Sequence, residues 1–255
     1  MHDEGEPAAL ETRKLNKSFG RIEVACDIDF RLRLGARHAL IGPNGAGKTT
    51  FIQLLTGALA PSSGAILLNG EDISGLSVYR RVKKGIARTF QLNTLLRALS
   101  VLENVQLAII EREGAGGALF GGRRVQREAA ETAYAILETL HIEDRADAAI
   151  SNLPYGQQRL VEIAIALALQ PKVLLLDEPA AGVPPADAHL VFETLATLPR
   201  TISVVIIEHD MKLVFGFAER ISVLVQGRIL REGTPSEIAN DELVRDVYLG
   251  RSRTP

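Results

Sequence analysis

The chain has 255 residues, of which 46% are hydrophobic and 24% are charged, a composition typical of folded globular proteins and not of disordered ones. Its 29 basic and 31 acidic side chains leave a formal net charge of −2, which argues against a nucleic-acid partner, because nucleic-acid-binding proteins usually carry a basic excess. The lone Cys26 excludes an intrachain disulfide and fits a reducing compartment, and no apolar stretch approaches the ~20 residues of a membrane-spanning helix.

The first clear pattern along the chain is an alternation of apolar and polar residues over Arg21–Leu34. The apolar side carries Ile22, Val24, Cys26, Ile28, Phe30, Leu32 and Leu34. A period of two residues with one polar face predicts a half-buried, antiparallel strand. Because Cys26 lies on the apolar side, we expect it to be a small core residue.

Short apolar runs followed by turn residues predict further strands at Ala39–Ile41, Ile66–Leu68, Val173–Leu176, Ser203–Ile207 and Ile221–Val225. The third and fourth of these runs are apolar on both faces, as expected for central strands of a parallel sheet that helices cover. Helical periodicity and composition predict helices over Thr49–Leu59, Arg127–Leu140 and Leu160–Leu169.

The order of these elements predicts how the chain is organised. Strands dominate before Gly70 and after Pro171, whereas the stretch between Leu92 and Gln170 is almost wholly helical. We therefore expect a single domain over residues 8–250, with an α/β core of residues 8–91 and 166–250 and a helical subdomain inserted at residues 92–165. The run Gly114–Gly122 with the following arginines, Arg123, Arg124 and Arg127, is expected to be a mobile loop, and phosphate binding there is the less favoured interpretation.

The strongest motif is Gly42-Pro43-Asn44-Gly45-Ala46-Gly47-Lys48-Thr49-Thr50, which fits the P-loop pattern of glycine, four residues, glycine, lysine and threonine. Glycines let backbone N–H groups turn around a phosphate, and the helix that begins near Lys48 directs its positive dipole end at the same anion. Lys48 supplies a charge for the β- and γ-phosphates, and the Thr49 hydroxyl is a candidate Mg²⁺ ligand. A turn that only joined strand to helix would need no Lys-Thr pair here, so we expect all nine residues to bind nucleotide.

A second motif separates the classes of P-loop protein. The segment Val173–Pro179 is an apolar strand that ends in two adjacent carboxylates, Asp177 and Glu178. Asp177, at the carboxyl end of the strand, is expected to orient Mg²⁺ beside the P-loop. Glu178 is expected to accept a hydrogen bond from the attacking water. Two solvated acids at a strand end are common, but that interpretation is less favoured after a fully apolar strand in a chain that has a P-loop.

Upstream of that strand, the segment Asn152-Leu153-Pro154-Tyr155-Gly156-Gln157-Gln158-Arg159 resembles the signature motif of ATP-binding cassette ATPases. The three motifs occur in the family's order, and the resemblance extends over roughly Leu10–Leu249. It implies an α/β P-loop NTPase (RecA-like) core with a mixed sheet, an N-terminal antiparallel β region and an inserted helical subdomain. It also implies that the ligands are ATP and Mg²⁺.

The resemblance assigns roles to residues that carry little signal alone. Phe19 matches the aromatic residue that stacks on adenine, with an ordinary core phenylalanine as an equal alternative. Gln91 matches a glutamine that senses Mg²⁺ and the attacking water, and His209 matches a histidine that contacts the γ-phosphate. Tyr155, Gly156 and Gln157 match residues of the signature loop. In the family this loop caps the γ-phosphate that is bound to the opposite subunit. The implied catalytic residues are Lys48, Gln91, Glu178 and His209, and the implied Mg²⁺ ligands are Thr49, Gln91 and Asp177.

The resemblance further implies that two cassettes close head to tail around two ATP molecules, each site combining the P-loop of one chain with the signature loop of the other. Two residues depart from the family pattern: Pro154 replaces the usual signature serine, and Tyr155 replaces a glycine. Without the serine, a hydroxyl contact to the γ-phosphate is missing. Pro184 stands where many cassettes have an aspartate, which bears on the coupling between the two sites. Lys48 and Glu178 are retained, so hydrolysis is still expected.

Several segments are similar to the ATP-binding subunits of branched-chain amino acid importers: Leu153–Arg159, Asp177–Gly182, Ile207–Met211, Ser100–Val105 and Val247–Gly250. Such a subunit would lie at the cytoplasmic face of the bacterial inner membrane and work with integral membrane permease subunits that a periplasmic solute-binding protein supplies. The group also includes importers of urea, amides and aromatic acids, so the cargo stays open, as does the choice between homodimer and heterodimer.

Three other classes of protein fit the sequence less well. A lipopolysaccharide-export ATPase shares the tail pattern but fits the Tyr155–Gln158 signature less well. A cassette protein that acts on ribosomes or DNA would usually carry two cassettes or a long coiled-coil insert, and this chain has neither. A small GTPase is disfavoured because Asn16–Phe19 lacks the aspartate of the guanine-reading motif and precedes the P-loop.

Overall fold

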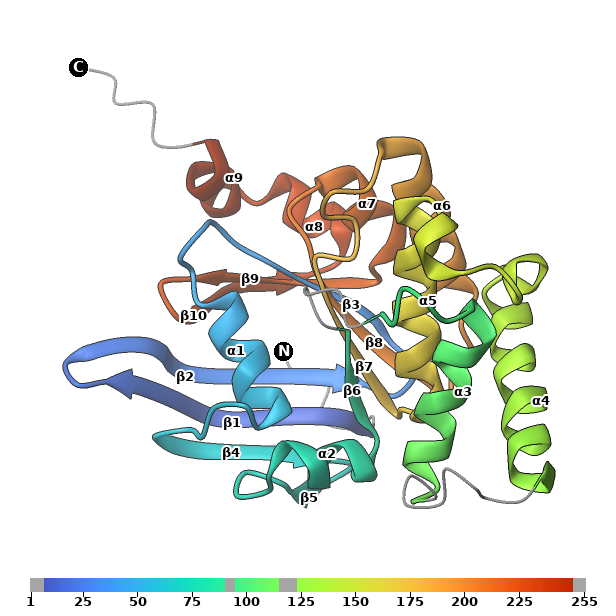
Figure 1. Ribbon diagram of the computed structural model, residues 1–255. Helices are drawn as coiled ribbons and strands as arrows, with labels where there is room; N and C mark the ends of the chain where they lie inside the picture. Colours follow the sequence, from blue (N-terminus) through green and yellow to red (C-terminus); the bar gives the residue numbers. More distant parts are fainter. Residues whose placement is uncertain (1–6, 90–94, 115–122, 250–255) are drawn as a thin grey trace.

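The structure, a computed structural model, describes residues 7–89, 95–114 and 123–249, and its strands form two sheets (Figure 1). The antiparallel sheet has the order β2-β1-β4-β5, with β1 Ala8–Phe19, β2 Ile22–Arg33, β4 Ser63–Leu68 and β5 Glu71–Asp72. The mixed sheet has the order β10-β9-β3-β8-β7-β6, with β3 Arg37–Ile41, β6 Ile86–Arg88, β7 Val173–Asp177, β8 Ser203–Ile207, β9 Arg220–Val225 and β10 Arg228–Gly233. In this sheet β9, β3, β8, β7 and β6 are parallel, and β10 is antiparallel to β9.

The helices in chain order are α1 Lys48–Thr56, α2 Val78–Lys84, α3 Val101–Arg112, α4 Arg123–Thr139, α5 Tyr155–Ala168, α6 Pro185–Thr197, α7 Met211–Phe217, α8 Pro235–Asn240 and α9 Glu242–Leu249. Short 3-10 turns, η2 Glu143–Arg145 and η3 Ile150–Asn152, connect α4 to α5. In the part of the chain that the structure describes, no helix combines the length and the apolar character that a bilayer crossing requires.

One hydrophobic cluster lies between the two sheets and fixes the position of α1. Phe51 and Leu54 of α1 are fully buried there, together with Phe30 of the antiparallel sheet and Leu175 and Val205 of the mixed sheet. Burial of a side chain of this size stabilises the fold by about 1.5–3 kcal/mol. The helix that begins at the P-loop is therefore held from both sides.

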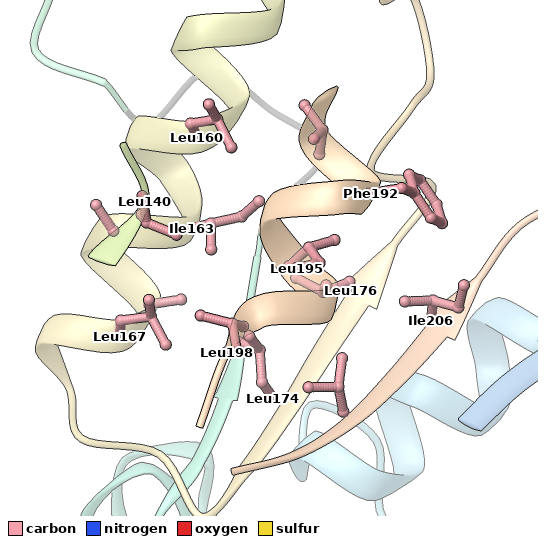
Figure 2. Packing of buried hydrophobic residues seen from close by; sticks show 14 of the residues in the cluster. Leu140, Leu160, Ile163, Leu167, Leu174, Leu176, Phe192, Leu195, Leu198 and Ile206 are labelled. Atoms are coloured by element: carbon pink, nitrogen blue, oxygen red, sulfur yellow. The ribbon is translucent and has the colours of Figure 1, made fainter. Parts of the chain in front are cut away.

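A second cluster covers the opposite face of the mixed sheet. Figure 2 shows side chains from α5 and α6 gathered over the strands β7 and β8. Its labelled members are Leu140, Leu160, Ile163, Leu167, Leu174, Leu176, Phe192, Leu195, Leu198 and Ile206. The helices α3, α4 and α5 of the predicted insert share this cluster with the sheet, and the predicted boundary at residues 165 and 166 falls inside α5. The division into core and subdomain stays a prediction.

The central strands confirm the interpretation of the apolar runs. Every residue of β3, β7 and β8 is buried, and these strands are parallel neighbours in the middle of the mixed sheet. An antiparallel sheet from the N-terminal part and a helical stretch between the two halves of the core were also expected, and both are present. The α/β fold class is thereby confirmed.

The alternation predicted for Arg21–Leu34 is wrong at both ends. Ile22 is 68% exposed, and Leu34 lies in the turn after β2 and is exposed as well. The cause at Ile22 is a β-bulge: Asp27 has a φ of +47°, the register with β1 shifts there, and Ala25 and Cys26 are buried in succession. Leu34 is exposed because β2 ends at Arg33. An inserted residue exchanges the two faces of a strand, so one period does not describe all of it. Cys26 is a core residue as expected.

Two helices begin earlier than predicted. α4 starts at Arg123 instead of Arg127, and Arg124 and Arg127 pair with Glu128 and Glu131 one turn later. Such pairs between residues four apart support a helix, so these arginines belong to α4 and not to a loop. α5 starts at Tyr155 instead of Leu160. The expected mobile loop at residues 115–122 lies outside the described residues.

Candidate nucleotide-binding site

The P-loop connects β3 to α1, and Lys48 is the first residue of that helix. The Lys48 Nζ donates hydrogen bonds to the carbonyl oxygens of Gly42 at 2.6 Å and Pro43 at 3.0 Å. Burial lowers the pKa of Lys48, while the carboxylates of Glu178 and Asp177 raise it. The ammonium is thus folded over the loop and faces the end of β7.

Glycine is required at two positions that clamp this loop. Gly47 has a φ of +103°, and a Cβ atom there would lie 2.7 Å from the Val24 carbonyl oxygen of β2. Gly227, in the turn between β9 and β10, has a φ of +75°, and its N–H donates to the Ala46 carbonyl at 2.9 Å. The Gly227 carbonyl accepts the N–H of Cys26 at 2.8 Å. Two chain segments far away in sequence therefore hold the P-loop in place.

A cavity of about 500 Å³ opens in front of the P-loop. Its lining residues are Ile22, Glu23, Val24, Asn44, Gly45, Ala46, Gly47, Lys48, Thr49, Thr50, Glu178, Ile207, Gln226 and Gly227. Sequence reasoning missed the contributions of β2 and of the β9–β10 turn. Two features of the sequence could have indicated these contributions: an apolar residue, Ile22, beside the Gly20-Arg21 turn, and the Gln226-Gly227 pair. In the structure this pair forms a tight hairpin turn with φ angles of +48° and +75°.

Phe19, the expected adenine platform, is not among the residues that line this cavity. It is 52% exposed, which excludes the core alternative, and the Lys17 ammonium lies 5.0 Å from its ring centroid. Ile22 and Val24 of β2 supply the apolar wall of the cavity instead.

The two carboxylates at the end of β7 occupy different surroundings. The Asp177 side chain is 2% exposed, and its Oδ2 accepts a hydrogen bond from Arg88 Nη2 at 2.8 Å. Glu178 has a φ of +49° and lines the cavity, and its N–H donates to the Ile207 carbonyl at 2.9 Å. Glu178 therefore lines the cavity with a left-handed backbone conformation, whereas Asp177 is not among the lining residues.

Glu208 organises the neighbouring strand end and was missed by the sequence reasoning. Its buried carboxylate accepts the N–H groups of Ala180 and His209, both at 3.0 Å. The His209 side chain itself is mostly exposed, and its Nδ1 lies 3.6 Å from the same carboxylate. The signal was an acidic residue directly after the apolar run of β8, the same pattern that identified Asp177.

The signature segment lies at the start of α5, away from the cavity of the same chain. A Cβ on Gly156 would lie 2.7 Å from the Cβ of Asp187 in α6, so a larger residue would push the two helices apart. The Tyr155 hydroxyl accepts a hydrogen bond from Arg159 Nη2 at 2.8 Å, and Arg159 also pairs with Glu162 at 2.6 Å. Burial raises the pKa of Glu162, against the lowering by Arg159.

Pro154 and Pro184 both precede a helix directly, α5 and α6 respectively. Neither supplies a side-chain cap to the helix that follows it, so the first N–H groups of α5 are not tied to a capping side chain. Tyr155, Gly156 and Gln157 do not line the cavity that the described residues form. Gln91 lies outside the described residues.

The residues near the P-loop fit a magnesium ion that is bound together with a nucleotide. In the described part of the chain no group of three or more His, Cys, Asp and Glu side chains could hold a metal alone. Mg²⁺ in nucleotide sites takes one or two protein oxygens and completes its shell with phosphate oxygens and water. Thr49 lines the cavity and offers a hydroxyl. Asp177, at the end of β7, is not among the lining residues, but its carboxylate is close enough to raise the pKa of Lys48 and offers the second oxygen donor.

Comparison with known proteins agrees with this geometry. The family model described as ABC transporter matches residues 26–181, and the one described as branched-chain amino acid ATP-binding cassette transporter matches residues 228–253. The chain is 39% identical over 252 residues to the high-affinity branched-chain amino acid transport ATP-binding protein LivG of Escherichia coli, covering 95% of this chain and 98% of that protein. It is 35% identical to the lipopolysaccharide export system ATP-binding protein LptB of Acidithiobacillus ferridurans, covering 94% and 96%.

Solved structures show the same fold. The crystal structure of the ADP conformation of MJ1267, an ATP-binding cassette of an ABC transporter, matches with a TM-score of 0.84 and 32% identity over 95% of this chain and 99% of that one. The dimeric structure of MJ0796, a bacterial ABC transporter cassette, matches with a TM-score of 0.73 and 25% identity over 89% and 98%. The P-loop, the cavity and these matches together show that the chain belongs to the ABC transporter family, as one of its ATP-hydrolysing cassettes.

Proposed function

We propose that this cassette powers the uptake of branched-chain amino acids, or of a related small solute, through separate permease subunits at the cytoplasmic face of a bacterial inner membrane. A periplasmic binding protein would deliver the solute. The likeness to LivG over nearly the whole chain and the C-terminal match at residues 228–253 support this choice over lipopolysaccharide export, for which the similar protein is less identical.

One observation carries the enzymatic part of the proposal. The cavity brings the P-loop, the Lys48 ammonium and the Glu178 carboxylate together at the carboxyl edge of the mixed sheet. The backbone N–H groups and Lys48 bind the phosphates, and the apolar residues Ile22 and Val24 cover the base. The Thr49 hydroxyl and the Asp177 carboxylate would hold Mg²⁺. When bound, that ion supplies charge for the transferring phosphoryl group.

Hydrolysis then depends on residues at two neighbouring strand ends. Glu178 accepts a hydrogen bond from the water whose oxygen attacks the γ-phosphorus, while the bridging oxygen leaves with ADP. His209 would contact the γ-phosphate, and the Glu208 carboxylate, which accepts the His209 backbone N–H, fixes the backbone at that position. Positioning of the water and the phosphate accounts for most of the catalysis in this reaction class.

The γ-phosphate side of the site is completed by a second cassette. In one chain the signature residues are absent from the cavity lining, while the N-terminus of α5 has N–H groups without a capping side chain. A second chain placed head to tail would direct that helix end at the bound phosphate. Loss of the γ-phosphate would remove the shared ligand and let the two chains separate.

Two variants, purified in the same way, test the roles of Glu178 and Lys48. Glu178→Gln should keep wild-type affinity for a fluorescent ATP analogue and lose at least about 100-fold in phosphate release, the typical contribution of a general base. Lys48→Ala should weaken the affinity itself, because the phosphates then meet only backbone dipoles. Unchanged phosphate release by Glu178→Gln would remove Glu178 from its role.

The same Glu178→Gln variant tests the assembly. With ATP it should elute at the mass of a dimer, and from detergent-solubilised membranes it should co-purify with integral membrane subunits. Lys48→Ala is the matched control that should stay monomeric under the same conditions. Recovery of ribosomes or DNA in place of membrane subunits would contradict the transport function, and a monomer with ATP bound would contradict the shared site.

A further inference from the structure

Arg88 is the last residue of β6, the edge strand beside β7. In the parallel register of these strands Arg88 is the partner of Leu175, and the N–H of the next residue, Thr89, donates to the Leu175 carbonyl at 3.1 Å. This pairing fixes the backbone of Arg88 two residues before the end of β7. The Arg88 side chain can therefore reach Asp177 at that end, and its Nη2 donates to Asp177 Oδ2 at 2.8 Å.

The pair is buried but incompletely hydrogen-bonded. Side-chain exposure is 16% for Arg88 and 2% for Asp177, and the buried Arg88 Nε has no hydrogen-bond partner among the described residues. A guanidinium can bind a carboxylate through two parallel hydrogen bonds, yet here a single nitrogen makes the contact. Buried pairs with unsatisfied donors contribute little net stability, so fold stability does not explain why an arginine stands at this position.

The contact distinguishes the two oxygens of the Asp177 carboxylate. Arg88 binds Oδ2, which leaves Oδ1 as the oxygen without a bond to the guanidinium. In metal sites, partners that orient a ligand from behind change the metal affinity by about 10- to 100-fold.

We propose that Arg88 is a positioning residue for the magnesium ion: it holds Asp177 through Oδ2 so that Oδ1 is presented to the cation beside the Thr49 hydroxyl. This inference rests on the Mg²⁺ site proposed above. The guanidinium also repels a cation, an effect of opposite sign. Orientation outweighs repulsion, because a buried carboxylate without its partner would turn toward solvent and leave the position that serves the ion.

The test separates the metal from the nucleotide. The affinity for a fluorescent ATP analogue is measured for each variant in excess Mg²⁺ and in EDTA, and the ratio of the two affinities reports the contribution of the ion. Arg88→Met should lower this ratio by about tenfold or more while the affinity in EDTA stays within about threefold of wild type. Arg88→Lys, which keeps the charge and one donor, should recover part of the ratio.

Arg112→Met is the matched control, because Arg112 is also largely buried and paired with a glutamate, Glu113, but its hydrogen bonds go to Glu113 and the Ala168 carbonyl and not to Asp177. Its ratio should equal that of wild type. An unchanged ratio in Arg88→Met, or a raised one, would overturn the inference, and so would equal losses in Mg²⁺ and EDTA, which mark a merely structural role. If Arg88→Met does not fold, Arg88→Lys decides: an unchanged ratio there overturns the inference. A wild-type ratio of one would instead refute the Mg²⁺ site itself.

Discussion

The turn between β9 and β10 supports the P-loop although about 180 residues of chain separate them, and Gly227→Ala tests this support. Gly227 has a φ of +75°, and an added Cβ would lie 2.7 Å from the Val24 carbonyl oxygen and 2.9 Å from the Val24 carbonyl carbon. Both neighbours are backbone atoms of β2, so they cannot move without moving the strand. The same residue links Ala46 and Cys26 through its N–H and its carbonyl.

The expected cost has two sources. A residue other than glycine in the left-handed region costs about 1–2 kcal/mol. Relief of the contact with Val24 must lengthen at least one of the two backbone hydrogen bonds of Gly227, at about 1 kcal/mol each. We expect the free energy of unfolding to fall by about 2–4 kcal/mol. Displacement of Ala46 should also weaken ATP binding by about tenfold, which corresponds to about 1.4 kcal/mol.

Urea unfolding and fluorescent-nucleotide titration measure the two effects, and two other glycines provide controls. Gly20→Ala has a similar φ, +61°, and no atom of the described residues lies within 4 Å of the added Cβ, so it isolates the cost of the backbone conformation. Gly216→Ala lies in α7, where the part of the chain that the structure describes leaves space for the added Cβ, and should be neutral or stabilising. If Gly227→Ala loses no more stability than Gly20→Ala and binds ATP like wild type, the proposed support of the P-loop is refuted.

Two further predictions concern buried polar groups. Burial lowers the pKa of His38 from 6.5 to about 4. Between these two pH values the unfolded chain binds a proton that the folded chain does not bind. The free energy of unfolding should therefore fall by up to about 3 kcal/mol as the pH drops from 6.5 to 4. In His38→Asn this part of the pH dependence of urea unfolding should vanish, and an unchanged slope would contradict it. Tyr155→Phe removes the hydrogen bond from Arg159 and should lower the free energy of unfolding by about 1 kcal/mol, while ATP affinity of the isolated chain stays the same, because Tyr155 does not line the cavity. A loss of affinity in that variant would show that α5 acts on the site within one chain.

The parts of the molecule that sequence predicted well are those with a local signal. The apolar runs of β7 and β8 gave buried strands, and the P-loop pattern gave a loop between β3 and α1 that lines a cavity. In each case neighbouring residues determine the structure, because glycines, apolar side chains and helix ends act within a few residues of chain. The carboxylates at the end of β7 belong to the same group.

The parts that were missed depend on contacts between distant segments. Ile22 was assigned to the core, yet a bulge at Asp27 turns it toward the nucleotide cavity, and the register with β1 that creates the bulge is not visible in β2 alone. Arg88 has no motif, and only the pairing of β6 with β7 brings it to Asp177. Likewise Gly227 looks like an ordinary hairpin residue until the mixed sheet places it against Ala46.

The strand order of the mixed sheet also governs when the site can form during synthesis. β3 leads into the P-loop near the beginning of the chain, but both of its neighbours, β8 and β9, follow more than 160 residues later. At roughly 5–20 residues per second a ribosome needs about 10–30 seconds to make that stretch. During this time the P-loop of the nascent chain lacks the strands that flank β3. Nucleotide binding by a ribosome-bound chain would therefore indicate that the last third of the polypeptide has left the ribosome and paired with β3.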